Sequence, residues 1–145
     1  MKAVIQRVQS AAVAVAGQTV GSIDHGLLVL LGIADTDTPQ QCDLLVKKIL
    51  NCRIFEDETG KMSSSVQDVG GHILCVSQFT LYADTSKGRR PNFTKAAKPE
   101  QAKRLYETCI DTFETMYKPI QTGQFGAMMS VSLVNDGPVT LIIEV

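Results

Sequence analysis

The sequence is poor in the residues that most often carry metal, redox or acid–base chemistry. Its 145 residues include two histidines, four cysteines and no tryptophan. No two cysteines form a CxxC pair, and no group of His, Cys and carboxylate residues has the spacing of a metal site. We therefore predict no metal site, and we expect the four thiols to be free and buried in a reducing compartment.

Long apolar segments are also absent. The longest apolar run covers residues 27–31, far short of the roughly 20 residues that cross a membrane as a helix. Residues 1–10 contain neither the apolar core nor the cleavage site of a signal peptide. We therefore expect a soluble cytoplasmic protein that has no membrane partner.

The composition is that of an ordinary globular domain. Hydrophobic residues make up 44% and charged residues 20% of the chain, and a chain of this length usually forms one domain. We predict a single domain over residues 1–145. The 14 basic and 15 acidic residues give a net charge of −1, which excludes a protein that holds nucleic acid by bulk charge but allows a local basic patch.

Hydrophobic patterning predicts more strand than helix. Residues 3–5, 12–15 and 27–31 are expected to be strands, with a turn at Gly17 and burial of the third run on both faces. Shorter strands are expected at residues 53–55, 72–79 and 141–143 and from residue 125 onward, with a loop at residues 62–71.

Two segments have the signals of amphipathic helices. Thr38, Pro39 and Gln41 form a capping-box pattern, and apolar residues follow at helical spacing. A second apolar face begins near Pro99 and ends at Pro119. The predicted fold class is α+β, with a mostly antiparallel, barrel-like β-sheet and two main helices packed against it.

The common catalytic motifs are missing, since the chain contains no GxSxG, HExxH, GxxxxGK[ST] or GxGxxG pattern. His25 and His72 are interpreted as a turn residue and a strand-end residue. The polar segment from Ser77 to Leu81 ends a buried strand, where free backbone N–H groups could stabilise an oxyanion. Thr80 could act as a nucleophile only with a base, and none is near it in sequence; a solvated strand end is the alternative.

Two further segments are unusual. Residues 135–140 contain Asn-Asp-Gly-Pro, in which Gly137 and Pro138 would present rigid, uncovered carbonyl oxygens, or would form an ordinary hairpin turn. Residues 87–104 carry seven of the 14 basic residues and one acidic residue. This concentration indicates a polyanionic partner, and a solvated basic face is the alternative.

These segments together resemble the D-aminoacyl-tRNA deacylases, formerly called D-tyrosyl-tRNA deacylases. The resemblance rests on SQFTL at residues 77–81, the GRRPNF loop and NDGPVT at residues 135–140, and it extends to the MKAVIQRV start and the FEDETGKM segment. It implies a homodimeric enzyme, with active sites at the subunit interface, that hydrolyses the ester between a D-amino acid and the acceptor end of tRNA. No metal or organic cofactor is implied.

The resemblance also implies roles for individual residues. The 2′-hydroxyl of the terminal ribose would assist the attack of water, and the backbone N–H of Phe79 would stabilise the oxyanion. Gly137 and Pro138 would form a Gly-cis-Pro dipeptide that enters the partner's site, excludes L-aminoacyl groups and leaves glycyl-tRNA as a substrate. The residues expected to form the catalytic part of the site are Gln78, Phe79 and Thr80, with Thr80 kept as a pocket residue rather than a nucleophile. Substrate binding is expected from Ser77, Leu81, Gly137 and Pro138, and tRNA contacts are expected from Lys87, Arg89 and Arg90.

Two other functions remain open at this point. One is a conventional hydrolase that uses Thr80 or a histidine on a small ester or amide. The other is a non-catalytic RNA-binding module, against which the net charge of −1 weighs slightly. A Thr80→Ala substitution separates the first from the deacylase, and decay of charged tRNA separates the second.

Overall fold

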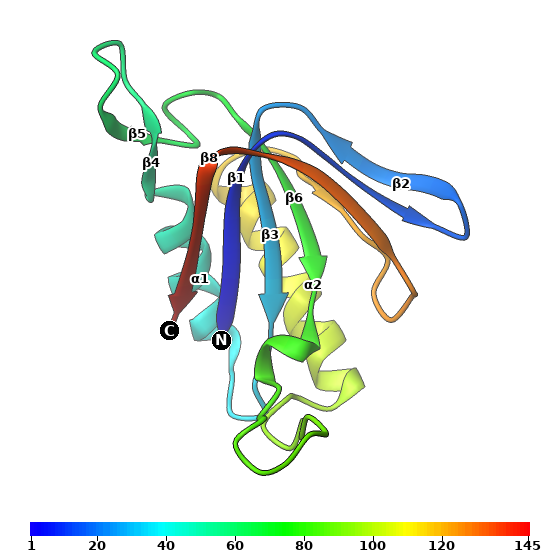
Figure 1. The fold of residues 1–145 in the computed structure, drawn as a ribbon. Coiled ribbons are helices and arrows are strands. Elements are labelled where there is room, and N and C mark those ends of the chain that lie inside the picture. Colours follow the sequence, from blue (N-terminus) through cyan, green and yellow to red (C-terminus); the bar gives the residue numbers. More distant parts are fainter.

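A curved six-stranded sheet forms the centre of the molecule (Figure 1). The computed structural model describes residues 1–145. The long central strand β1 pairs along one edge with β8 and along the other with β3 and then β2. The strands of this sheet are β1 (Lys2–Val15), β2 (Gln18–Ile23), β3 (Gly26–Gly32), β6 (His72–Ser77), β7 (Gln121–Thr122) and β8 (Ser130–Glu144).

The sheet is mixed. β1 is antiparallel to β2, β3 and β8, whereas β3–β6 and β6–β7 are parallel pairs. Parallel neighbours need a long crossover, and the two crossovers here contain α1 (Pro39–Leu50) and α2 (Pro99–Met116). The predicted α+β class is confirmed, and the expected antiparallel character holds for the part of the sheet around β1.

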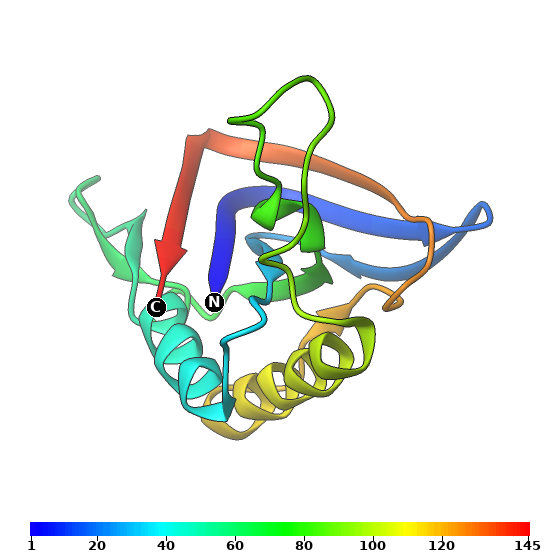
Figure 2. The same ribbon diagram turned by 90° about the horizontal axis from the view of Figure 1, so that it is seen from below.

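Both helices cover the same face of the sheet (Figure 2). The capping box predicted at the start of α1 forms, with Gln41 Oε1 accepting the Thr38 N–H at 2.9 Å. The predicted apolar face of α1 is also confirmed, because its five members are all buried, namely Cys42, Leu45, Val46, Ile49 and Leu50. This face supplies part of the main core against β1, β3 and α2.

The sheet curls until its two ends nearly meet, which gives the barrel-like shape. A second apolar cluster lies inside the curl and joins β1 and β2 to β3 and β6, with Val13, Ile23, Leu28 and Leu74 among its members. β2 lies so close to β7 that a Cβ atom on Gly21 would be 2.6 Å from the Thr122 carbonyl oxygen. Only glycine allows this approach.

Three predicted element boundaries were wrong. The runs at residues 3–5 and 12–15 belong to the single strand β1. The strand expected over residues 72–79 ends at Ser77, and a 3₁₀ helix, η1 (Phe79–Tyr82), follows it. The strand expected from residue 125 begins only at Ser130, after a loop that packs Phe125 against Tyr106 with ring centroids 5.8 Å apart.

The loop predicted at residues 62–71 is also partly wrong, because β5 (Met62–Ser65) pairs with β4 (Arg53–Glu56) as a separate hairpin. The Asp57 carboxylate organises the turn between them. It accepts hydrogen bonds from the N–H groups of Thr59 and Lys61 at 2.8 and 3.1 Å and from the Ser63 hydroxyl. These bonds hold the pKa of Asp57 well below its usual range.

All four cysteines are free thiols, as expected. Three are buried and Cys52 is half-buried, and burial raises the pKa of Cys75 to about 12. No helix is long and apolar enough to span a membrane.

Two glycine substitutions test the parallel β3–β6 pairing. In Gly26→Ala, the new Cβ would overlap the His72 carbonyl oxygen and lie 2.6 Å from the His72 nitrogen, so we expect the free energy of unfolding to fall by about 3 kcal/mol or more. Gly17 has a φ of +80° and open space around it, so Gly17→Ala should cost only about 1 kcal/mol. Urea denaturation of both variants gives the comparison, and equal losses would contradict it.

Candidate functional site

The segment from Ser77 to Leu81 lies where β6 leaves the sheet. The Gln78 N–H still donates to the Leu31 carbonyl of β3 at 2.8 Å, and η1 then begins at Phe79. The first N–H groups of a helix have no partner inside it. The turn therefore presents backbone donors at Phe79 and Thr80, as an oxyanion site requires.

The side chains of this segment are arranged around that turn. The Gln78 amide donates to the Thr80 hydroxyl, and the Leu81 side chain and the Gln78 carbonyl oxygen lie against Gly32 at the end of β3. Phe79 is 57% exposed, which is unusual for a phenylalanine. Ser77 is half-buried and Thr80 is exposed. The structure thus brings together the five residues that the sequence predicted as a group.

Neither histidine belongs to this site. The His72 N–H donates to the His25 carbonyl at 3.0 Å, which places both residues at the start of β6. Ser77 is at the other end of that strand, about 16 Å away at 3.3 Å per residue. Neither imidazole can therefore take a proton from Thr80 of the same chain. No group of three or more His, Cys, Asp or Glu side chains could hold a metal ion.

The Asn-Asp-Gly-Pro segment is a bulge inside β8, and the alternative of a hairpin turn is wrong. Asn135 pairs with Val8 of β1, and Thr140 pairs with Gln6. Residues 136–139 therefore lie opposite Arg7 alone. The Gly137–Pro138 peptide bond is cis, and both residues are exposed.

Hydrogen bonds within β8 hold this bulge. Asn135 Oδ1 accepts the Val139 N–H at 2.8 Å, and its amide nitrogen lies 3.3 Å from the Val139 carbonyl oxygen. Gly137 has a φ of +138°, and a Cβ there would lie 2.8 Å from the Val139 side chain and 3.3 Å from the Arg7 guanidinium. The position therefore requires glycine.

Arg7 anchors the bulge to the rest of the protein. Its Nε donates to the Asp136 carbonyl at 3.0 Å and lies 3.3 Å from the Asp136 carboxylate, while Nη1 donates to the Ile54 carbonyl at 2.7 Å. The side chain is only 7% exposed. Our sequence reasoning missed Arg7, although an arginine that follows Ala3 and Ile5 in the inward register of one strand is a usable signal.

A single chain does not bring the two segments together. β3 and β1 separate β6 from β8, so the two strands are about 14 Å apart across the sheet at about 4.8 Å per spacing. They also lie at different heights, because η1 follows the lower end of β6 and the bulge lies at the upper bend of β8 (Figure 1). No atom of residues 77–81 is among the nearest neighbours of a Cβ built on Gly137.

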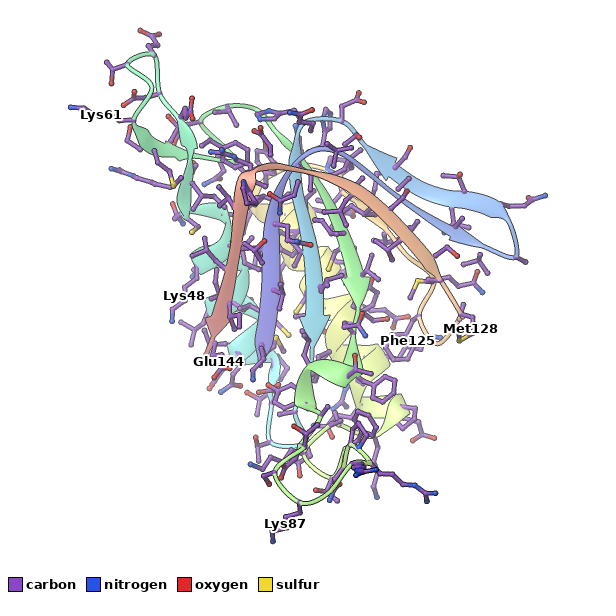
Figure 3. All side chains as sticks on the ribbon, viewed as in Figure 1. Lys48, Lys61, Lys87, Phe125, Met128 and Glu144 are labelled. Atoms are coloured by element: carbon purple, nitrogen blue, oxygen red, sulfur yellow. The ribbon has the colours of Figure 1, made fainter.

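Residues 84–93, which we call the basic loop, project beside η1 and extend away from the helices (Figures 2 and 3). Lys87 lies at the tip of this loop (Figure 3). Arg89 and Arg90 are exposed, and none of these three side chains takes part in an ion pair. The loop therefore offers uncompensated positive charge next to the Phe79 turn.

Comparison with known proteins agrees with this geometry. The family model described as D-Tyr-tRNA(Tyr) deacylase matches residues 4–144. The chain belongs to this deacylase family. It is 58% and 57% identical over 144 residues to proteins from Halalkalibacterium halodurans and Brevibacillus brevis, both named D-aminoacyl-tRNA deacylase, with 99% of each chain covered. The resemblance inferred from the motifs is thus confirmed.

A solved structure has the same fold over the whole chain. The protein titled c-Myc DNA Unwinding Element Binding Protein is 47% identical to this chain and superimposes with a TM-score of 0.96. The match covers 100% of this chain and 99% of the other. The named deacylase relatives are hydrolases that act on ester bonds, which confirms the enzyme class expected from the resemblance.

Removal of the Arg7 guanidinium tests its role in this deacylase. Arg7→Met leaves the carbonyl groups of Ile54 and Asp136 without their donor, so we expect a loss of about 1–3 kcal/mol in stability. Amide exchange at Val139 should also accelerate. The matched control is Arg53→Met, since Arg53 is exposed on β4. Arg7→Met is expected to differ from this control in both urea denaturation and hydrogen exchange, and identical behaviour would contradict the anchoring role.

Proposed function

We propose that this chain hydrolyses the ester bond of D-aminoacyl-tRNA, releasing free D-amino acid and tRNA. The observation that carries this proposal is the match to the deacylase family over residues 4–144. The whole of residues 1–145 then acts as one deacylase domain. Its place is the cytoplasm, where tRNA is charged, and its role is chiral proofreading in translation.

The chemistry requires little from the protein's side chains. A water oxygen attacks the ester carbonyl carbon, the bond to the ribose oxygen breaks, and the attacking water's proton passes to that oxygen. The 2′-hydroxyl of the terminal ribose assists the attack. This is consistent with the absence of a histidine from residues 77–81. The protein supplies position and charge stabilisation, with the Phe79 N–H as the oxyanion donor.

The remaining residues of the turn line the pocket. Gln78 and Thr80 hold each other through their side-chain hydrogen bond, and this contact fixes the entrance to η1. Ser77 and Leu81 flank them and contact the terminal adenosine and the aminoacyl group. Thr80 acts as a pocket residue and not as a nucleophile, because its hydroxyl accepts a hydrogen bond from the Gln78 amide and neither histidine of its chain lies near it.

A second copy of the chain completes each site. Gly137 and Pro138 are too distant from Phe79 of their own chain to share a substrate with it. β8 is an edge strand with an exposed apolar surface, including Val134 at 51% and Ile142 at 67% exposure. A surface of this kind is typical of a protein–protein contact, and a two-fold dimer would bring the bulge of each chain to the Phe79 turn of its partner.

The bulge would act as the chiral filter. The residues on either side of Gly137–Pro138 are held in place, because Arg7 donates to the Asp136 carbonyl and Asn135 accepts the Val139 N–H. The carbonyl oxygens of the bulge therefore cannot move aside. A side chain on the L face of the substrate's Cα would collide with them, while a D side chain would point away. Glycine has no Cβ, so glycyl-tRNA is accepted by the same geometry.

The tRNA itself would bind through the basic loop. Lys87, Arg89 and Arg90 are free of ion pairs and lie next to the Phe79 turn. Phosphates near the acceptor end are the anions that such side chains contact. This local patch explains how a chain of net charge −1 could hold tRNA.

A side-by-side assay tests the proposed function. Purified protein is incubated with D-tyrosyl-tRNA, L-tyrosyl-tRNA and glycyl-tRNA, and the ester that remains is measured over time. We expect rapid loss of the D-tyrosyl and glycyl esters and decay of the L-tyrosyl ester at the buffer rate. Binding without faster decay would instead indicate a non-catalytic RNA-binding module.

The same assay with Thr80→Ala separates the deacylase from a conventional hydrolase. Because the deacylase does not use the Thr80 oxygen in a covalent step, we expect turnover within about tenfold of the wild-type value, the loss reflecting only the Gln78 contact. A threonine nucleophile predicts no turnover at all. Thr115→Ala, at an exposed threonine on α2, provides the control for handling and folding.

A further inference from the structure

The basic loop is clamped at its base. Asp84 and Asn92 exchange two backbone hydrogen bonds, at 2.8 and 2.9 Å. Their side chains accept the N–H groups of Ser86 and Thr94 at 2.9 and 2.8 Å. Residues 85–91 therefore project from a hydrogen-bonded pair of residues. A ligand that displaces the loop would move the residues next to this pair first.

Phe93, which follows the clamp, packs directly on Phe79. The ring centroids are 5.0 Å apart and the planes are inclined by 59°, within the range of favourable aromatic pairs. Phe93 is half-buried. The residue that carries the proposed oxyanion donor thus has its side chain against the base of the loop that carries the positive charge.

Both segments are also attached to the same end of β3. The Leu31 carbonyl accepts the Gln78 N–H at 2.8 Å, and the Ile33 carbonyl accepts the Ala97 N–H at 2.9 Å. The Asp35 N–H donates to the Lys95 carbonyl at 3.1 Å. With both backbones held there, the Phe79–Phe93 contact adds a side-chain link between the basic loop and the Phe79 turn.

The charges on the loop are available to a ligand. Asp84 is the one carboxylate within residues 84–93, and its side chain is engaged by Ser86. Lys87, Arg89 and Arg90 are exposed and unpaired. An anion that binds them would restrain the basic loop, and Phe93, which follows the loop's hydrogen-bonded ends, contacts Phe79.

We infer that the basic loop makes turnover depend on the polynucleotide, and that Phe93 is the positioning residue that connects phosphate binding at Arg89 and Arg90 to Phe79. The inference rests on the proposed function. Binding energy from phosphates remote from the ester is then used to hold the Phe79 N–H in place during the reaction. A short ester that ends at the terminal adenosine binds but reacts slowly.

The test compares two substrates, D-tyrosyl-tRNA and 2′(3′)-O-D-tyrosyl-adenosine. Wild-type kcat should be at least about tenfold higher on the tRNA. Arg89→Gln/Arg90→Gln should reduce the ratio of kcat on the tRNA to kcat on the short ester to about one. It should also reduce the salt dependence of tRNA binding by about two phosphate contacts.

Phe93→Ala is the decisive variant. It should reduce the same kcat ratio to about one while leaving the KM for tRNA and its salt dependence as in the wild type. Adding Phe93→Ala to Arg89→Gln/Arg90→Gln should then cause no further loss of kcat, since both changes break one connection. If Phe93→Ala melts early, Phe93→Leu retains apolar bulk without the ring and gives the same comparison.

The matched control for charge is Lys47→Gln/Lys61→Gln, which removes two exposed basic residues from α1 and from the β4–β5 hairpin. Figure 3 shows Lys61 and Lys87 at opposite ends of the molecule. This control should keep wild-type kcat on both substrates.

Several results would overturn the inference. They are an equal effect of Phe93→Ala on both substrates, additive losses in the combined variant, or equal wild-type kcat on tRNA and on the short ester. These results differ from a failure of the proposed function, in which the wild-type protein cleaves neither ester and the inference fails with it.

Discussion

The account depends on the buried guanidinium of Arg7. It is buried and donates to backbone carbonyls of two segments distant in sequence, Ile54 on β4 and Asp136 on β8. A buried charge of this kind is costly unless every donor has a partner, so its position determines where β8 can bulge. The exposed Gly137–Pro138 unit is rigid because Arg7 and Asn135 hold its two ends.

The two halves of the proposed site use the same physical means, which is backbone polarity held in place by side chains. At η1 the turn presents N–H donors, and in β8 the bulge presents C=O acceptors. Neither half needs a strong base, which fits an ester that brings its own ribose hydroxyl. The register of the sheet keeps the halves apart in one chain, so the proposal that a second copy unites them follows from topology together with the apolar edge of β8.

Local features were predictable from the sequence, and long-range ones were not. The capping box at Thr38 and the apolar face of α1 depend on neighbours within two turns, and both predictions were correct. The segment around Gly137 has the composition of a hairpin turn, yet it continues β8, because an arginine on another strand and the pairing with β1 decide its path. The pairing of β5 depends on the hydrogen bonds that Asp57 accepts in the preceding turn. The composition of residues 62–71 does not reveal these bonds.

Mixed dimers test most directly whether each site is built from two copies. Phe79→Pro removes the oxyanion N–H at a helix start that tolerates proline. Gly137→Ala introduces a Cβ that the bulge cannot hold, so the displaced bulge no longer completes the partner's site. Each variant alone should be inactive on D-tyrosyl-tRNA. When the two are unfolded together, refolded and assayed, half of the dimers contain one intact site, so activity should return to about a quarter of the wild-type value. Absence of any recovery in verified mixed dimers would contradict the shared site.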